Sequence, residues 1–192
     1  MIRNAELNLG DCYLAVGRLD EAQRTLETVH RESQQSGAWG EEWMKWRYTQ
    51  HLNASLGELW LARGNTEKAL LFAGACLATA EATESRRNIV KGRRLKGEAL
   101  LEQGKLAEAE TELVEALRVA REVRNPAQLW KTLTAQARLR QAQARPEDAR
   151  TVIQEALAIV ERVAAGLDDP ALRDTFLASP QVSALREAAA VK

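Results

Sequence analysis

The sequence has few of the residues that build metal, redox and nucleotide sites. Its 192 residues include two histidines, two cysteines and four prolines. His30 and His51 do not form a His-Glu-x-x-His pair, Cys12 and Cys76 lie far apart, and no glycine-rich loop ends in Lys-Ser or Lys-Thr. The usual ligands of zinc and of nucleotide phosphates are therefore missing. We expect no metal site, no cofactor and no enzymatic activity.

An excess of charge of one sign is also missing, because 27 Lys and Arg residues balance 27 Asp and Glu residues. Such a chain has no global field that would hold it on nucleic acid or on anionic lipid. Local arginine pairs at 86–87 and 93–94 are a weak basis for nucleic-acid binding. No apolar run reaches about 18 residues, so we expect a soluble, cytoplasmic protein. Both cysteines lie within apolar helical stripes, which predicts buried, reduced thiols.

Alanine and leucine are abundant, and this balance is typical of a helical protein. A phrase that runs from glycine to alanine recurs at 17–22, 64–69 and 104–109, and a fourth copy at 144–149 has Ala144 in place of the glycine. The closing alanines are separated by 47, 40 and 40 residues. A repeat of this length indicates a stacked solenoid, in which each unit buries its apolar face only against its neighbours.

Apolar residues recur at helical spacing throughout the repeats and predict four helical hairpins. We expect Asp20 and Thr66 to cap their helices, and Pro126 and Pro146 to begin theirs. The expected helix pairs are about 3–16 with 20–35, 41–63 with 66–83, 85–103 with 106–123, and 126–143 with 147–164. Two short stretches, 171–177 and 182–190, are expected to form a terminal cap. The prediction is one domain over 1–192, with repeats at about 3–36, 38–83, 85–124 and 126–165 and a cap at 167–191.

The positions of small and large residues within each unit resemble the tetratricopeptide repeat. The matching positions are Leu9, Gly10, Tyr13, Ala22, Leu26 and Val29 in the first unit, Leu56, Gly57, Trp60, Ala69, Ala73 and Cys76 in the second, and Gly97, Leu100, Ala109, Leu113 and Ala116 in the third. The fourth unit is weaker, because Ala137 and Arg140 replace the glycine and the aromatic residue. The resemblance implies an all-α, right-handed superhelical solenoid of about four hairpins that binds proteins.

Three further features resemble the C-terminal repeat regions of large bacterial signalling proteins. They are the 40-residue units, the run Trp-Met-Lys-Trp-Arg-Tyr at 43–48, and the ending at 169–180. Regions of that kind follow a regulatory ATPase, a nucleotide cyclase or a protein kinase. The resemblance implies a role in bacterial signalling and raises the expectation that this chain is part of a larger protein.

In such a solenoid the first helix of each hairpin lines the concave wall. One stripe on these helices is mostly basic and has polar neighbours, and it predicts a groove for an acidic or carboxylate-bearing peptide. The predicted groove residues are Arg47, Tyr48, His51, Asn88, Lys91, Arg94, Lys131, Thr134 and Arg138. The alternative is that these are ordinary solvated charges, offset by Glu58, Glu98 and Glu102 on the same helices.

Five tryptophans are the next unusual feature. Trp60 and Trp130 lie on packing stripes and are expected in the core. Trp43 and Trp46 lie where the long helix overhangs its partner, so they form either an exposed aromatic contact for a partner or a contact buried against the first hairpin.

Two hypotheses for function follow. The first is a non-enzymatic scaffold whose groove binds a peptide or an adjacent domain. The alternative is an oligomerisation or autoinhibitory segment of a larger regulatory enzyme, with the first hairpin as the contact surface, which implies a possible homo-oligomer.

Overall fold

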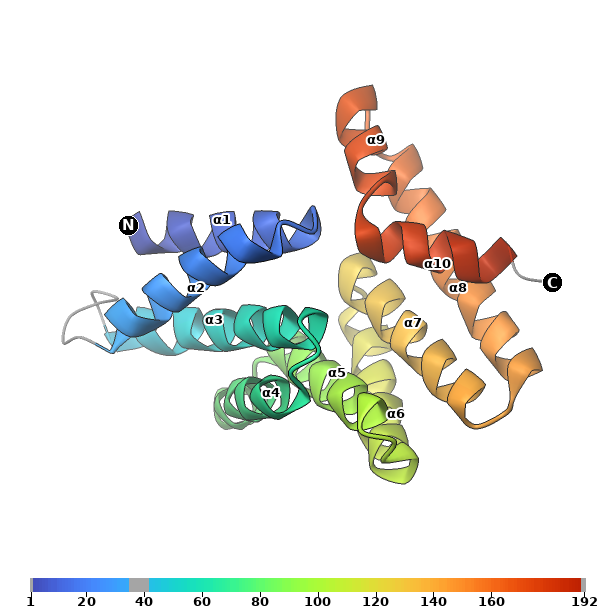
Figure 1. Cartoon of the computed structure of the whole chain (residues 1–192), viewed down its shortest axis with the longest axis horizontal. Helices are drawn as coiled ribbons and strands as arrows, with labels where there is room; N and C mark the ends of the chain where they lie inside the picture. The colour runs from blue at the N-terminus through green and yellow to red at the C-terminus, as the bar shows by residue number, and fades with distance from the viewer. Residues whose placement is uncertain (1, 35–41, 191–192) are drawn as a thin grey trace.

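The computed structural model describes residues 2–34 and 42–190, and every regular element in this part of the chain is a helix (Figure 1). The all-α prediction is confirmed. The helices are α1 (Ile2–Ala15), α2 (Leu19–Ser33), α3 (Glu42–Ala62), α4 (Thr66–Ala82), α5 (Arg86–Glu102), α6 (Leu106–Val123), α7 (Pro126–Ala142), α8 (Pro146–Ala165), α9 (Pro170–Leu177) and α10 (Pro180–Ala190).

Consecutive helices pair into hairpins, α1 with α2, α3 with α4, α5 with α6, and α7 with α8. The first helices also contact one another in series, α1 with α3, α3 with α5, and α5 with α7. Each second helix contacts the first helix of the next hairpin. The first helices therefore form one continuous inner layer, and any groove on this layer is lined by α3, α5 and α7.

The helices of a hairpin approach most closely at the small residues of the repeat. A Cβ atom on Gly10 would lie 2.5 Å from Leu26 Cδ2, and one on Gly97 would lie 2.6 Å from Leu113 Cγ. Ala22 and Ala109, on the second helices of these hairpins, have no exposed surface. The packing role predicted for these glycines and alanines is confirmed.

The turn inside each hairpin has the same backbone geometry in all four copies. Gly17, Gly64 and Gly104 have φ angles of 78°, 72° and 74°, and Ala144 follows them at 56°. In each turn the next N–H donates to the carbonyl five residues back, as Lys105 does to Leu100 and Arg145 to Arg140. Since this left-handed conformation favours glycine, Ala144 is the strained member of the set.

The C-terminal helices fold back onto the last hairpin. Val182 and Leu185 of α10 are buried with Trp130 and Leu133 of α7. The turn between α9 and α10 reaches the first hairpin, because a Cβ atom on Gly17 would lie 3.0 Å from Pro180 Cγ. The array therefore curves so that the turn between α1 and α2 lies near the turn between α9 and α10, while the two chain ends lie on opposite sides (Figure 1).

Three local predictions are wrong. The cap of α4 is Asn65 rather than Thr66, because the Asn65 side chain accepts a hydrogen bond from the Lys68 N–H. Asp20 is inside α2, which begins one residue earlier, and it pairs with Arg63. Cys12 is exposed, since α1 packs on α2 through its opposite side, whereas Cys76 is buried as predicted.

Substitution of Ala144 by glycine is expected to stabilise the protein. The change removes the steric cost of a Cβ atom at positive φ, and we expect the free energy of unfolding to rise by about 1 kcal/mol. Chemical denaturation measures this change. The matched variant Gly104→Ala places a Cβ atom in the same turn one repeat earlier and should lose a similar amount. A lower stability for Ala144→Gly would contradict the strain argument.

Candidate functional site

Two adjoining cavities lie on the inner layer. The first, called here the α1 cavity, has a volume of about 440 Å³ and lies between the end of α1, the inner face of α3, α5 and α7, and α9. The second, the α10 cavity, has a volume of about 380 Å³ and lies between α3, α5, α7 and α10. The two cavities share Glu58, Trp130, Lys131 and Gln181. They are therefore two parts of one hollow on the concave side.

A network of alternating charges crosses the floor of this hollow and links α3, α5 and α7. Arg94 is at its centre, with a side chain that is only 3% exposed. Its Nη2 atom lies 2.5 Å from Glu58 Oε1, and its Nη1 atom lies 2.6 Å from Glu98 Oε2. Lys131 extends the network from Glu58 at 3.5 Å. At the other end, Arg138 contacts Glu98 at 3.8 Å and also pairs with Glu102.

Glu58 has the most strongly perturbed carboxyl group of this network. Burial by itself raises the pKa of Glu58, but the positive charges of Lys131, Arg94 and Lys91 outweigh burial and lower the pKa to about 2. Glu58 is therefore ionised throughout the physiological pH range. It acts as an anchor for surrounding cations rather than as a proton donor.

The structure brings together five of the nine predicted groove residues. They are Lys91, Arg94, Lys131, Thr134 and Arg138, all of which line one or both cavities. Three of the four basic members are paired with glutamates, while Lys91 makes no hydrogen bond or ion pair with any described residue. The stripe is therefore less positive than its basic residues alone suggest.

The other four predicted groove residues do not line either cavity. Arg47 is exposed, and Tyr48 packs against the core of the first two hairpins. Asn88 donates hydrogen bonds to Gln50 and Ser85. His51 lies 2.5 Å from Asp11, which links α3 to α1.

Asp11, His51 and Ser55 form a cluster whose geometry bears on catalysis. Ser55 donates to Asp11 Oδ1, and His51 Nε2 contacts Asp11 Oδ2. The carboxylate therefore stands between the hydroxyl and the imidazole. A nucleophilic serine needs the imidazole as its direct hydrogen-bond partner, so this cluster joins two helices and does not activate Ser55.

The tryptophans divide between core and surface. Trp60 and Trp130 are 8% and 5% exposed, which confirms the core prediction, although Trp130 also forms a wall of both cavities. Trp46 is 40% exposed. The predicted contact of Trp43 stays a prediction, because its side chain lies outside the described residues. Trp39 also lies outside the described residues.

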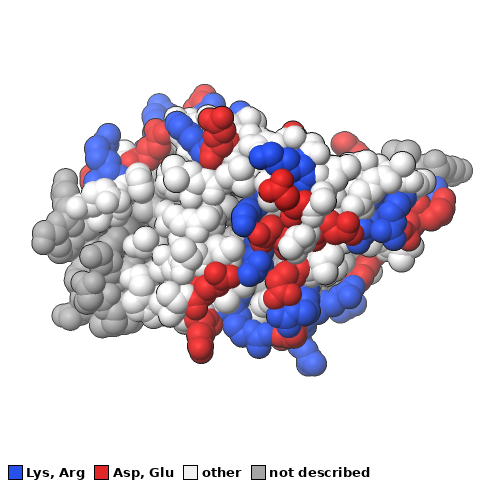
Figure 2. Space-filling view, turned by 90° about the horizontal axis from the view of Figure 1, so that it is seen from below, with Lys and Arg blue, Asp and Glu red and all other residues white. Residues whose placement is uncertain are grey.

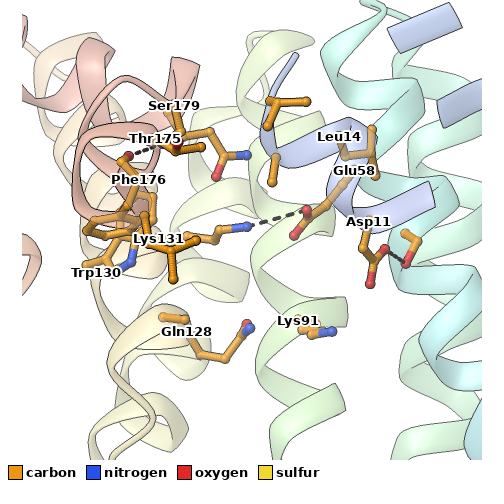
Figure 3. Close-up of a pocket in the computed structure, with 16 residues that line it drawn as sticks. Asp11, Leu14, Glu58, Lys91, Gln128, Trp130, Lys131, Thr175, Phe176 and Ser179 are labelled. Carbon is orange, nitrogen blue, oxygen red and sulfur yellow. Dashed lines mark hydrogen bonds and ion pairs between the residues drawn. The ribbon is translucent and has the colours of Figure 1, made fainter. Parts of the chain in front are cut away.

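Several cavity residues were not predicted from the sequence. Gln128 of α7, Leu172 and Phe176 of α9, and Gln181 of α10 all line the hollow. Figure 3 shows Trp130 and Phe176 on one side of the α1 cavity and Leu14 and Asp11 on the other, with Lys131 directed at Glu58 between them. Leu172 and Phe176 are four residues apart, which is a helical spacing. This spacing is the sequence signal from which an apolar face on α9 could have been predicted.

Charges on the outer surface are mixed in sign. On the face in Figure 2, basic and acidic side chains are interspersed beside a broad uncharged area. Arg86 pairs with Glu122, and Arg93 pairs with Glu81 and Glu112. Ion pairs thus neutralise much of the local positive charge that the arginine pairs 86–87 and 93–94 offered, which gives further reason to disfavour nucleic-acid binding.

Within residues 2–34 and 42–190, no cluster of three or more His, Cys, Asp or Glu side chains has the arrangement of a metal site. None of the helices in this part of the chain combines the length and apolar character that crossing a bilayer requires.

Stacked helical hairpins with repeated turns and a concave inner hollow define a helical-repeat solenoid. Residues 92–162 match the family model of the tetratricopeptide repeat, which confirms the resemblance and assigns this segment, from the middle of α5 to α8, to that family. Repeats of this family generally mediate protein–protein interactions and are typically non-catalytic, which supports a scaffold role. A comparison with curated proteins gives no match.

The ionised state of Glu58 is expected to make the fold sensitive to acid. The folded-state pKa of about 2 lies below the ordinary value of 4.5, so the contribution of Glu58 to stability is complete above pH 4.5 and is lost as the pH falls towards 2. At pH 7, Glu58→Gln should lower the free energy of unfolding by about 3 kcal/mol. Denaturation at several pH values measures this difference, which should shrink steadily below pH 4.5.

The matched control is Glu115→Gln, which removes a carboxylate from an exposed pair with Arg118. This variant should change stability by less than about 1 kcal/mol. A Glu58→Gln effect that is as small, or that does not decline in acid, would show that the network contributes little to stability.

Proposed function

We propose that the chain is a non-enzymatic interaction module that docks a peptide, or an extended loop of an adjacent domain, in the concave hollow. The observation that carries this proposal is the continuity of the α1 and α10 cavities through Glu58, Trp130, Lys131 and Gln181. Their volumes are within the range of about 300–1,000 Å³ that is usual for binding pockets. Two joined pockets suit successive side chains of one extended segment.

The charges of the hollow limit the partner. Since glutamates already neutralise Arg94, Lys131 and Arg138, a strongly acidic partner would have to compete with existing ion pairs. We therefore propose a partner with apolar side chains and a single acidic group. Trp130 would contact the apolar part, as buried aromatic side chains commonly do in interfaces.

The setting that we propose is bacterial signalling in the cytoplasm. The support for it is the resemblance of the 40-residue units and of the ending at 169–180 to repeat regions of large signalling proteins. In that setting the docked segment would come from a partner or from a neighbouring domain of the same assembly.

Selection from a display library of random dodecapeptides tests whether the hollow binds peptides. Gln181 is exposed and lines both cavities, so an indole at this position should fill the shared space. We expect Gln181→Trp to weaken the selected peptides by at least about tenfold, as measured by fluorescence anisotropy. Gln34→Trp, at the exposed end of α2, is the matched control and should leave affinity unchanged. Equal binding of the selected peptides to both variants would show that the hollow is not their binding site.

A second candidate, self-association through the first hairpin, is favoured by one observation. Leu9 and Cys12 on α1, and Val16 in the turn directly after it, are exposed at spacings of three and four residues, and Leu9 and Val16 are 45% and 47% exposed. Apolar residues at this spacing form a stripe that another helix can cover.

Light scattering tests self-association. If the stripe joins two copies, the wild type should have the mass of a dimer and Leu9→Lys the mass of a monomer. Leu71→Lys changes a leucine that is 66% exposed on α4 and should remain dimeric. A monomeric wild type would eliminate this candidate.

A further inference from the structure

We infer that the α1 cavity is the site for a tyrosine side chain of the docked segment. This inference rests on the proposed function, because it names the side chain that one part of the hollow selects. Three properties of the lining carry it, namely apolar walls, balanced charges and a buried amide group without a partner.

The walls of the cavity are apolar and come from the first hairpin and from the C-terminal half of the chain. Leu14 of α1 and Val16 of the turn after it face the cavity, as do Trp130 of α7 and Leu172 and Phe176 of α9. Val16 is 47% exposed and Leu172 is 59% exposed, although both border the cavity. An aromatic ring between these walls would remove their apolar surface from water.

The charged groups of the lining balance one another. They are two carboxylates and two ammonium groups, those of Asp11, Glu58, Lys91 and Lys131. Both oxygens of Asp11 have hydrogen-bond partners on α3, and the three cations around Glu58 hold its pKa at about 2. A ligand with a net charge of either sign would meet as many repelling as attracting groups. The cavity therefore suits an uncharged group.

Gln128 indicates that this uncharged group also makes a hydrogen bond. Gln128 lines the cavity and is only 7% exposed, yet its amide oxygen is buried without a hydrogen-bond partner among the described residues. Buried polar atoms almost always have partners, because burial removes the hydrogen bonds that water would supply. Figure 3 shows the Gln128 amide directed from α7 towards α5, below Trp130. A ligand that fills the cavity would supply the missing partner.

Among aromatic side chains, tyrosine matches this amide. The terminal bond of glutamine has two favoured orientations, which present either the oxygen or the NH₂ group to the cavity. A phenol hydroxyl both donates and accepts hydrogen bonds, so it pairs with the amide in either orientation. Phenylalanine would leave the oxygen unpaired, and an indole only donates. The cavity volume of about 440 Å³ is sufficient for one aromatic side chain.

Titration with N-acetyl-L-tyrosinamide and with N-acetyl-L-phenylalaninamide tests the inference. The two probes are uncharged and have the same ring and the same amides, and they differ only in the hydroxyl. We expect the tyrosine probe to bind at least about tenfold more tightly, with NMR shifts at the Trp130 indole N–H and the Gln128 side-chain amide. Equal affinity, or shifts at other residues only, would overturn the inference without any variant.

The variant Gln128→Leu removes the amide and keeps a side chain of similar size. It should bind the two probes equally. The matched control is Gln136→Leu, because Gln136 lies two turns further along α7 and also has a buried amide oxygen without a partner, but it lines neither cavity. This control should keep the wild-type preference. Circular dichroism and denaturation establish that both variants are folded, and a preference for tyrosine that survives in folded Gln128→Leu would overturn the role of Gln128.

Further probes test the absence of charge selection and the source of the phenol. Tyramine is a cation and desaminotyrosine is an anion, and neither should bind more tightly than uncharged p-cresol. N-acetyl-L-tyrosinamide should bind more tightly than p-cresol, because its amides resemble the backbone of a polypeptide. Tighter binding of a charged probe than of p-cresol would contradict the selection of an uncharged group. Equal binding of p-cresol and N-acetyl-L-tyrosinamide would show that the site takes free phenols instead.

Failure of the tyrosine site is distinguishable from failure of the proposed function. Library peptides that bind wild type but not Gln181→Trp, and that keep their affinity when each tyrosine is replaced by phenylalanine, would retain the interaction module and eliminate the tyrosine site. Library peptides that lose at least about tenfold in affinity on the same replacement, in wild type but not in Gln128→Leu, would support both.

Discussion

The structure depends on close contact between the two helices of each hairpin at residues without large side chains. At Gly10 and Gly97 even a methyl group would collide with a leucine of the partner helix. Because this contact recurs at matched positions, successive hairpins stack in the same way and the first helices meet in one layer. The concave hollow follows from that layer, since curvature places α3, α5 and α7 side by side around it.

The polar chemistry of the hollow follows from the same stacking. Helices that meet through small residues bring their longer side chains together beside the contact, and here these are arginines, lysines and glutamates from three hairpins. Arg94 is buried because it has two carboxylate partners, and its removal would leave Glu58 and Glu98 without their main cation. Arg94 therefore supports the fold.

The sequence was sufficient for the helices, the turns and the small packing residues, because each depends on local spacing. It was not sufficient for the site. Five of the nine residues in the predicted stripe line the hollow, but the pairs Arg94–Glu58 and Arg138–Glu102 each join residues 36 positions apart in the chain. Gln128 and Phe176 could not be recognised as site residues, because only the curvature of the whole array brings α7 and α9 opposite α1.

The two C-terminal helices contribute differently to this arrangement. α10 buries Val182 and Leu185 against the last hairpin, as expected of a helix that covers the end of a stack. α9 buries no residue fully. Polar contacts hold its start, since Asp169 caps its first turn and Arg173 donates to the carbonyls of Ala164 and Leu167 at the end of α8. At its other end, Phe176 and Leu177 are partly buried against the core of the last hairpin. Because the packing uses only the last turn of α9, Leu172 stays 59% exposed and borders the cavity together with Phe176.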